Sequence, residues 1–488
     1  MAGLLGAVAS LNANYLYATN HYWSSANQDA TPACVVFPTN AEDVSAVVQL
    51  LLEYPNVPFA VKSGGHNANT GFSSVNGGVL ISFQDLDSTV LSSDYKTAEV
   101  GPGARWMDAA GALELYGLTV VGGRLGDIGV GGLLLGCGLS FLSAQYGLPC
   151  DNIVNYEVVL SDGAIVNANA NSNPDLFWAL KGGGDQFGIV TKYTLNTYPI
   201  GKVWGGVRTY RTDYANQLLS ATQDFTENCQ DPRASIFTTI NLLLEGLDAF
   251  VAVFLFYDGP VPPTGLFDKF LVGTPYIVDQ LQTQTYTELL TANANFGSVY
   301  GYRYLLRGAT IPSLAGTNGT DLVIANWDNF FSYVTTQKSL LSLLEVDFVW
   351  DLIYQPMPTM IPEASARINP AGNLLGLSSS SGDHMWMACT IAWKLPLGDS
   401  NAHQMAVDII NGISTYVQEA YPGVEASKYQ PGYVAPPGYD LIFMNDAMAD
   451  QPVLQGYGDA TYQRLKYIQK EYDPMGVFPQ RTNGFKFT

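Results

Sequence analysis

The sequence predicts a mixed α+β fold, organised as two domains or as one domain with a large insert. The chain has 488 residues, which exceeds the usual size of a single hydrophobic core. In its first part, short strand signals alternate with helical ones, as is typical of α+β and α/β domains. Near residue 200 the glycine clusters thin out and aromatic residues become frequent. This change in composition marks the expected domain boundary.

Before residue 200, short runs of β-branched and aromatic residues predict strands, and apolar residues at helical spacing predict helices. Either Thr39 or Asn40 is placed to cap the first of these helices. The pair of segments 154–160 and 164–167 is typical of a hairpin. The predicted strands cover 33–37, 59–62, 79–83, 97–100, 118–121, 154–160, 164–167 and 187–195, and the predicted helices cover 41–52, 106–116 and 175–180.

After residue 200 the predicted elements become longer, and alternating strands bracket helices. Aromatic side chains are frequent here while charged ones are few, so we expect some of the aromatic side chains to face a ligand. The few charges also argue against a highly charged ligand. The predicted strands cover 237–243, 249–257 and 388–393, and the predicted helices cover 214–229, 330–344, 401–420 and 460–472.

Charge and composition exclude several classes of partner. The net charge is −21, and a polyanionic surface with no basic cluster repels nucleic acid. No apolar run is long enough to cross a bilayer. The five cysteines and four histidines show no metal-type spacing, and so few cysteines allow one disulfide or none. We therefore expect no nucleic-acid partner, no membrane span and no metal.

The N-terminal segment 2–11 is apolar and resembles the core of a short signal peptide, but no basic residue precedes it. A packing helix is therefore the favoured interpretation of this segment, and a true signal would have been removed from the sequence. One glycosylation sequon, Asn318-Gly319-Thr320, is compatible with secretion. We expect the secretory pathway or secretion rather than a cytoplasmic location.

Two glycine-rich stretches dominate the first domain. The denser stretch spans residues 122–132, and Ser63-Gly64-Gly65-His66 precedes it. Glycine lets the backbone approach a ligand closely, and its bare N–H groups can line an anion site. The two stretches therefore predict a backbone cradle for a large, flat and phosphorylated ligand. His66 leaves a strand directly after two glycines, where a neutral imidazole can act as a base, a ligand or a nucleophile toward the bound group.

Six segments in sequence order resemble one known family, the FAD-linked oxidases that include vanillyl-alcohol oxidase. Within it, the chain looks like a fungal member of the berberine-bridge-enzyme-like group. The resemblance is specific over residues 30 to 200, returns at Tyr472-Asp473-Pro474, and is loose across 200 to 430. The segments are Lys62 to His66, Val100 to Trp106, Gly129 to Gly132, Tyr146 to Asn152, Phe177 to Gly184 and Phe187 to Val190.

The resemblance implies a two-domain FAD-binding fold of the vanillyl-alcohol oxidase type, with an antiparallel-sheet substrate domain inserted. Residues 1–200 would form the N-terminal part of the FAD domain, 201–435 the substrate domain, and 436–488 the return to the FAD domain. In this family the histidine that matches His66 is bonded covalently to the flavin. The resemblance also implies that FAD is held by the following residues: Lys62, Ser63, Gly64, Gly65, His66, Asn67, Ser73, Pro102, Gly122, Gly123, Asp127, Ile128, Gly131, Gly132, Gly138, Leu139, Ser140, Tyr146, Gly147, Asp151, Asn152, Gly188, Ile189, Val190 and Asn445.

The sequence departs from the family pattern in two places near the flavin. Many relatives carry a second tether, a cysteine, where this chain has Leu125, so the resemblance implies a single covalent bond through His66. Ile128 stands where a smaller valine tends to admit oxygen, which puts fast oxidase behaviour in doubt. Cys137 replaces a usual glycine twelve residues after Leu125, and the tethering role does not transfer to it.

The third departure concerns the catalytic base. Relatives often carry Tyr-x-Asn-Tyr near the C-terminus, whereas Phe443-Met444-Asn445-Asp446 keeps only the asparagine. The family's usual proton acceptor therefore cannot be assigned by resemblance. Asp446 and Tyr457 are the favoured candidates, and His384 and Tyr302 are the others.

The resemblance implies an FAD-dependent oxidoreductase. A hydride would pass from a small organic molecule, such as an alcohol, an amine or a secondary-metabolite intermediate, to covalently bound flavin. O2 or another acceptor would then reoxidise the flavin. Three alternatives stay open: a pericyclase or isomerase that retains the flavin without net redox, an oligosaccharide oxidase, and a flavoprotein that only binds a ligand.

Overall fold

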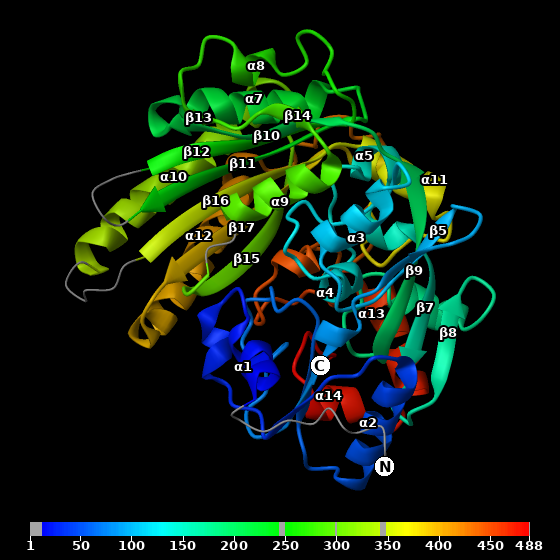
Figure 1. Cartoon of the computed structure of the whole chain (residues 1–488). Helices are drawn as coiled ribbons and strands as arrows, with labels where there is room; N and C mark the ends of the chain where they lie inside the picture. Colours follow the sequence, from blue (N-terminus) through cyan, green and yellow to red (C-terminus); the bar gives the residue numbers. More distant parts are fainter. Residues whose placement is uncertain (1–11, 244–248, 298–299, 342–347, 488) are drawn as a thin grey trace.

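Three β-sheets are formed by the residues that the computed structural model describes, which are 12–243, 249–297, 300–341 and 348–487. Two sheets use strands from before residue 200, and the third uses strands from after it. In Figure 1 the large sheet and its helices occupy the upper part of the molecule, and the two smaller sheets the lower part. The apolar N-terminal segment 2–11 lies outside the described residues.

The first sheet is three-stranded and parallel, with the order β1-β3-β2. The second is six-stranded and antiparallel, with the order β4-β5-β9-β7-β8, and β6 also pairs with β9. The predicted hairpin is confirmed, because β7 and β8 are paired antiparallel neighbours. The strand bounds are β1 Cys34–Val36, β2 Phe59–Lys62, β3 Val79–Ser82, β4 Thr89–Leu91, β5 Thr97–Val100, β6 Leu118–Val120, β7 Ile153–Val159, β8 Ile165–Asn169 and β9 Ile189–Pro199.

Helix α2 (Ala41–Glu53) shows how the sequence sets a helix in this region. Asn40 is its N-cap, and the side-chain oxygen accepts a hydrogen bond of 2.8 Å from the backbone N–H of Asp43. Its apolar positions, including Val44 and Val48, are buried against the small parallel sheet. The other helices of this part are α1 Ala13–Asn20, α3 Trp106–Glu114, α4 Val130–Leu135, α5 Ser143–Tyr146 and α6 Pro174–Ala179.

The third sheet is eight-stranded and antiparallel, with the order β13-β10-β12-β11-β16-β17-β15 and with β14 also paired to β10. Together with the mixed helix and sheet content, it confirms the predicted α+β class with an antiparallel sheet after residue 200. The bounds are β10 Val203–Arg211, β11 Ala234–Leu243, β12 Ala249–Tyr257, β13 Tyr276–Asp279, β14 Gln282–Gln284, β15 Arg303–Pro312, β16 Phe348–Met357 and β17 His384–Trp393.

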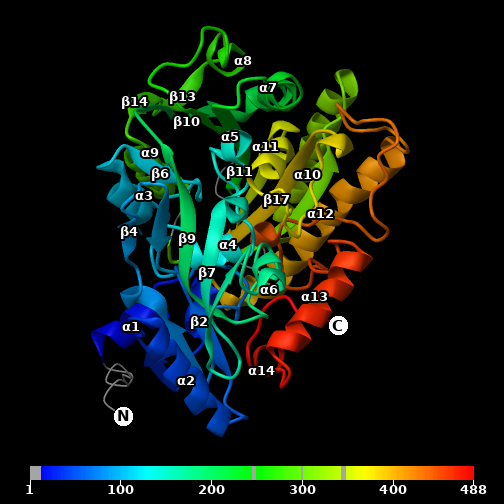
Figure 2. The same cartoon turned by 90° about the vertical axis from the view of Figure 1, so that its right-hand side faces the viewer.

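Helices α7, α10 and α12 cover one face of this large sheet, while α9 packs on the β10 and β12 part of the other face, which is turned toward the rest of the molecule. Ile236, Ile240 and Leu352 belong to the core between the sheet and helices α7, α10 and α12, and Figure 2 shows α10 and α12 stacked beside β17. The helices that follow β10 are α7 Ala215–Asn228, α8 Asp268–Leu271, α9 Tyr286–Gly297, α10 Thr317–Leu341, α11 Met360–Ile368 and α12 Asp399–Ala420.

Helix α10 begins at Thr317, well before the start predicted at residue 330. The sequon residues Asn318 to Thr320, which are typical of a loop, form its first turn, and Asn318 is exposed. Residues 342–344 of the predicted helix lie outside the described residues.

The C-terminal segment returns to the N-terminal part of the molecule. Helices α13 (Asp459–Tyr472) and α14 (Val477–Arg481) lie beside the strands of the first 200 residues in both views (Figures 1 and 2). Arg481 donates hydrogen bonds to the carbonyl oxygens of Leu51 and Val57, at the end of α2 and just beyond it. The two ends of the chain therefore stabilise one another.

Candidate functional site

A cavity of about 660 Å³ separates the glycine-rich segments from the face of the large sheet opposite α7, α10 and α12. This volume is within the range of small-molecule and cofactor sites. We call the glycine-rich side (residues 63–67, 124–125, 128–138 and 184–190) the floor and the sheet side (β11, β12, β15, β16 and β17) the ceiling. Residues far apart in the sequence thus line a single space.

Two backbone segments abut in the floor. A Cβ on Gly64 would lie 2.5 Å from the nitrogen of Gly129, and a Cβ on Gly129 would lie 2.4 Å from the nitrogen of Gly64. The Ser63 hydroxyl ties the segments together, because it donates to the Pro102 carbonyl and accepts from the N–H of Gly131 at 3.2 Å. A Cβ on Gly132, by contrast, would meet nothing within 4 Å, since this glycine faces the open cavity. The floor is therefore a bare backbone surface.

His66 stands at one end of the floor. Its ring stacks on Trp23 with 4.5 Å between ring centroids, and Trp23 stacks in turn on Tyr304 of the ceiling at 4.2 Å. Burial, together with the positive charge of Arg105, lowers the pKa of His66 to about 4, although Asp127 opposes the shift. The imidazole is thus neutral at physiological pH, which is its nucleophilic form.

The C-terminal segment is hydrogen-bonded to the other end of the floor through Asn445. The Asn445 side chain accepts from the N–H of Gly138 at 3.0 Å and donates to the carbonyl of Leu133 at 3.3 Å. A Cβ on Gly136 would collide with that same side chain. A disulfide between Cys137 and Cys150 braces this segment from behind. This is the one disulfide that the cysteine count allowed.

The ceiling follows the alternation of a β-strand. On β16, the side chains of Val349, Asp351, Ile353 and Gln355 line the cavity, while those between them pack toward the helices. The other strands obey the same rule. They contribute Phe237, Thr239, Asn241, Leu243, Phe250, Phe254, Tyr304, Leu306, Thr390 and Ala392, and Tyr302 joins them from the residue before β15. Most of this surface is apolar or aromatic.

Two neighbouring residues of the ceiling each carry a buried polar atom without a hydrogen-bond partner. Asn241 and Asp351 are direct partners across β11 and β16, and Asp351 pairs with Thr390 on its other side. The Asn241 Nδ2 and the Asp351 Oδ1 are buried and have no hydrogen-bond partner. Burial raises the pKa of Asp351 to about 7. Because unsatisfied buried polar atoms are costly, this pair is suited to bind a polar group of a ligand.

A second polar group spans the floor and the ceiling. Arg124 donates to the Gln355 side-chain carbonyl, and the Gln355 amide donates to Asp446 Oδ2 at 2.6 Å. The Arg124 guanidinium also lies over the Phe237 ring, 4.5 Å from its centroid. Burial lowers the pKa of Arg124 to about 10 and raises the pKa of Asp446.

Many of the expected cofactor contacts do line this cavity, mainly those of the two glycine stretches and their flanks. They are Ser63, Gly64, Gly65, His66, Asn67, Ser73, Pro102, Ile128, Gly131, Gly132, Gly138, Leu139, Gly188, Ile189, Val190 and Asn445.

Other residues expected to contact the cofactor do not line the cavity and lie behind the floor. Lys62 points away, because its ammonium donates to the Ala18 carbonyl at 2.6 Å. Gly122 and Gly123 pack under the Trp106 indole, where a Cβ would collide with the ring. Asp127 accepts instead from the Tyr300 hydroxyl at 3.1 Å.

The expected contacts between Ser140 and Asn152 are also structural. The Tyr146 ring stacks on Tyr198 at 3.8 Å, and Asn152 bonds the carbonyls of Tyr146 and Leu148. Their neighbours are tied in similar ways. Ser140 accepts from the N–H of Leu142, Gly147 abuts the backbone of Ser365, and Asp151 accepts from Asn369 and Asn373.

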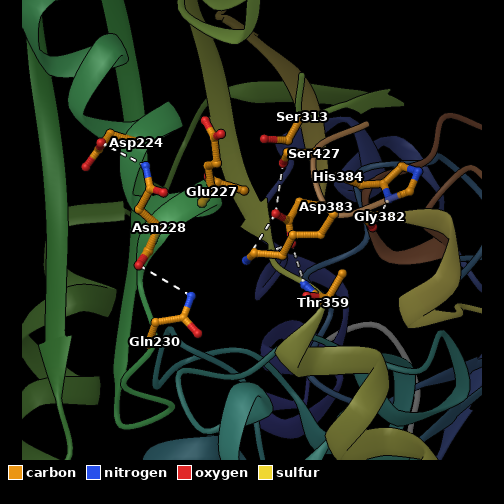
Figure 3. A network of polar contacts seen from close by, with 12 residues as sticks. Asp224, Glu227, Asn228, Gln230, Ser313, Thr359, Gly382, Asp383, His384 and Ser427 are labelled. Carbon is orange, nitrogen blue, oxygen red and sulfur yellow. Dashed lines mark hydrogen bonds and ion pairs between the residues drawn. The ribbon is translucent and has the colours of Figure 1, made fainter. Parts of the chain in front are cut away.

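The four candidate proton acceptors separate clearly. Asp446 and Tyr302 line the cavity. Tyr457 does not, because its buried hydroxyl donates to the Gly182 carbonyl at 2.8 Å. His384 opens β17 beside the buried Asp383 network, with its ring nitrogen 2.9 Å from the Gly382 carbonyl (Figure 3). Among the four candidates, the structure therefore places Asp446 and Tyr302 at the cavity, and Tyr457 and His384 away from it.

Sequence reasoning missed most polar groups of the ceiling, namely Asn241, Asp351, Gln355 and Thr390, as well as Arg124 of the floor. One signal was available for Asp351. In the run 348–355 the large apolar side chains alternate with smaller or polar ones, and this alternation places a carboxylate on the cavity face of an otherwise apolar strand.

Among the described residues, no cluster of histidine, cysteine or carboxylate side chains is arranged to hold a metal ion. A search of the same residues for helices with the length and hydropathy of a membrane span finds none.

The comparisons with known proteins agree with this geometry. Residues 32–169 match the family model described as an FAD binding domain. An FAD-linked oxidoreductase of Arthroderma benhamiae is 35% identical over 96% of this chain and 89% of its own length. An FAD-dependent monooxygenase of Aspergillus calidoustus is 30% identical over 97% of this chain and 86% of its own.

Solved structures share the fold at lower identity. The 6-hydroxy-D-nicotine oxidase of Arthrobacter nicotinovorans has a TM-score of 0.74 at 20% identity, covering 99% of this chain and 98% of that one. Berberine bridge enzyme from Eschscholzia californica has 0.70 at 16%, covering 100% and 98%. The glucooligosaccharide oxidase of Acremonium strictum, which carries a 6-S-cysteinyl, 8α-N1-histidyl FAD, has 0.70 at 19%, covering 96% and 95%.

The residues of the cavity fit an FAD. The floor offers bare backbone where a dinucleotide requires close approach, and Gly132 leaves open space where a side chain would intrude. His66 adds a neutral imidazole that faces the cavity. From these matches and this fit, the chain belongs to the fungal FAD-linked oxidoreductases, and it shares its fold with berberine bridge enzyme and 6-hydroxy-D-nicotine oxidase.

Proposed function

We propose that this oxidoreductase dehydrogenates a CH–OH or CH–NH group of a small, largely apolar molecule, with FAD attached to His66 and with Asp351 as the proton acceptor. The observation that carries the proposal is the orphaned carboxylate oxygen of Asp351 on the ceiling, across the cavity from the glycine floor.

Asp351 is better suited than Asp446 to accept a proton. A base needs a lone pair directed at the substrate before its pKa matters. One oxygen of Asp446 already accepts from the Gln355 amide, and the cation of Arg124 lies beyond that amide. Asp351 Oδ1 has no partner, and its pKa of about 7 lets the carboxylate take a proton near neutral pH. We therefore assign Asp446 a positioning role in place of the catalytic role expected from the sequence.

In the proposed reaction the substrate loses one hydride and one proton. Bound FAD would supply the acceptor for one hydride, which carries both electrons of the oxidation. The substrate loses the hydrogen on carbon with its electron pair, and its hydroxyl or amine proton passes to Asp351 Oδ1 as the C=O or C=N bond forms. Asn241 is the cross-strand partner of Asp351, and its unpaired Nδ2 would donate to the same substrate heteroatom. O2 or another acceptor then removes the electrons from the cofactor.

Attachment through His66 alone is supported by its surroundings. The imidazole is buried, neutral and oriented by stacking on Trp23. Leu125 lines the same cavity, where a thiol would be needed for a second bond, so the cofactor would be held by one tether.

The shape and chemistry of the ceiling favour an aromatic or cyclic substrate. Phe237 stacks on Phe254 at 4.0 Å, and Phe296 closes the same end of the cavity. Such a surface gains free energy by burying apolar area and offers only a few groups to fix orientation.

The test is anaerobic reduction of the bound flavin. Purified protein is mixed with a panel of small aromatic and cyclic alcohols and amines, and the flavin absorbance is followed by stopped flow. We expect bleaching by at least one compound, and a rate about 10²- to 10⁴-fold lower in Asp351→Asn. Product formed while the flavin stays oxidised would instead identify a non-redox catalyst, and an undiminished rate in Asp351→Asn would remove this residue from the mechanism.

A further inference from the structure

Arg124 is a buried cation that makes no direct ion pair among the described residues, and the charge of Asp446 acts on it only from beyond Gln355. Within the described residues no carboxylate lies close enough to form an ion pair with it, and its one side-chain hydrogen bond goes to the neutral amide of Gln355. The guanidinium faces the cavity beside the Phe237 ring. A buried charge is costly unless it is paired, so this arrangement is incomplete until a ligand adds a negative group.

Resting on the proposed function, we propose that Arg124 anchors a planar anionic oxygen group of the substrate, either a carboxylate or the enolate of a 1,3-dicarbonyl. The guanidinium presents a rigid fork of donors, and only one of these donors is used by Gln355. Two parallel hydrogen bonds to a planar pair of oxygens match that fork.

The neighbours of Arg124 hold the fork in place without neutralising it. Gln355 accepts from Arg124 with its carbonyl and donates to Asp446 with its amide, which fixes the orientation of the side chain. Gln355 therefore lies between the Asp446 carboxylate and the Arg124 guanidinium. The Phe237 face contributes a cation–π contact on the ceiling side.

In this proposal Arg124 and Asp351 contact different parts of the substrate. Asp351 is four residues before Gln355 on β16, so the two side chains face the cavity from the same strand. The anionic end of the substrate would bind at Arg124, and the carbon to be oxidised would lie toward Asp351. The substrate carries one negative charge, which agrees with the scarcity of charge after residue 200, because the cation comes from the floor.

The experiment measures ligand binding to the oxidised holoenzyme and needs no turnover. Benzoate and the 1,3-dicarbonyl dimedone are the two anionic probes, and benzamide is the neutral match for benzoate. Each is titrated while the flavin absorbance spectrum is recorded, in the wild type and in Arg124→Gln. We expect both anions to bind about 10- to 100-fold more weakly to Arg124→Gln, with benzamide unaffected. A loss for one anion alone would identify which of the two groups the site accepts.

Gln355→Glu is the second variant, because it leaves Arg124 intact and supplies an internal carboxylate. It is expected to weaken benzoate and dimedone as Arg124→Gln does, while Arg124→Lys retains part of the affinity. Flavin content and thermal unfolding show that each variant is folded.

Three outcomes would overturn the anchor. They are equal weakening of benzoate and benzamide, no binding of either anion to the wild type, and a changed flavin reduction potential in Arg124→Gln with anion affinity unchanged. The last outcome would mean that Arg124 serves the cofactor. Because the probes are not oxidised, a failure of Asp351 as the base would leave this result unaffected.

Discussion

Asp351 shows how a strand can place an ionisable group where catalysis requires it. The side chain lies between Asn241 and Thr390 in register and far from bulk solvent, and burial raises its pKa to about 7. The charged neighbour that an ordinary ion pair would provide is absent among the described residues. Desolvation alone therefore raises the pKa of this carboxyl group.

This environment predicts a pH dependence for substrate oxidation. A proton acceptor works only when ionised, so the rate constant for flavin reduction should rise with pH below about 7 and reach a plateau above it. Asp351→Asn should remove that limb as well as most of the rate. Stopped-flow reduction across pH measures both effects. A limb that persists unchanged in Asp351→Asn would assign the titration to another group, of which Asp446 is the nearest candidate.

Ile128 predicts how the reduced flavin is reoxidised. It lines the cavity beside Gly129, where the two floor segments meet, and from the resemblance its larger side chain is expected to slow the access of O2. Ile128→Val removes one methylene, so we expect faster reaction of the reduced flavin with O2 and only a small loss of stability, about 0.5–1.5 kcal/mol. Stopped-flow mixing with aerated buffer gives the rate, and Leu125→Val is a matched control on the same wall.

At the level of the element, two glycines of the floor differ in what a methyl group would do. Gly129→Ala would place a Cβ 2.4 Å from the Gly64 nitrogen, which forces the floor apart and should cost about 1–3 kcal/mol. Gly132→Ala meets no protein atom within 4 Å and lies within α4, so folding should be unharmed or slightly favoured. Its methyl group would instead occupy cavity space.

The two substitutions should therefore separate stability from cofactor loading. Gly129→Ala lowers the melting temperature, whereas Gly132→Ala keeps it in the flavin-free protein but lowers flavin content. Gly412→Ala, on the exposed side of α12, controls for the change of residue type. Full flavin loading in Gly132→Ala would contradict the assignment of this part of the cavity to FAD.

At the scale of the whole molecule, the cofactor would join the two sides of the cavity, and His66 would make that joint permanent. His66→Ala should yield a protein that binds FAD reversibly and releases it on acid precipitation, while the wild type keeps its colour when denatured. Its stability should then rise with added FAD, by about 2.7 kcal/mol at one hundred times Kd. Calorimetric scans at several FAD concentrations measure this dependence. Free FAD released from the denatured wild type would refute the tether.

The floor was predictable from the sequence and the ceiling was not, for a physical reason. The glycines of the floor lie in short contiguous stretches, namely Gly64-Gly65 and Gly131-Gly132. Each stretch by itself is enough to predict an exposed backbone surface. The central row of the ceiling joins Asn241, Asp351 and Thr390 across three strands, and only the sheet register brings them together.

The direction of single side chains was equally hidden. Tyr457 follows a C-terminal segment that does reach the cavity, yet its hydroxyl points to the Gly182 carbonyl. Asp127 and Lys62 belong to the glycine stretches and still face away, toward Tyr300 and Ala18. Motif membership therefore predicts the path of the backbone more reliably than it predicts contact with a ligand.

The alternation along β16 has a consequence for how such a chain can diversify. Trp350, Leu352 and Tyr354 pack in the helical layer, whereas Val349, Asp351, Ile353 and Gln355 line the cavity on the opposite face of the strand. Mutations at every second position can therefore explore new chemistries while the scaffold beneath them stays untouched. A lineage built on this plan can acquire new substrates without first having to rescue its own folding.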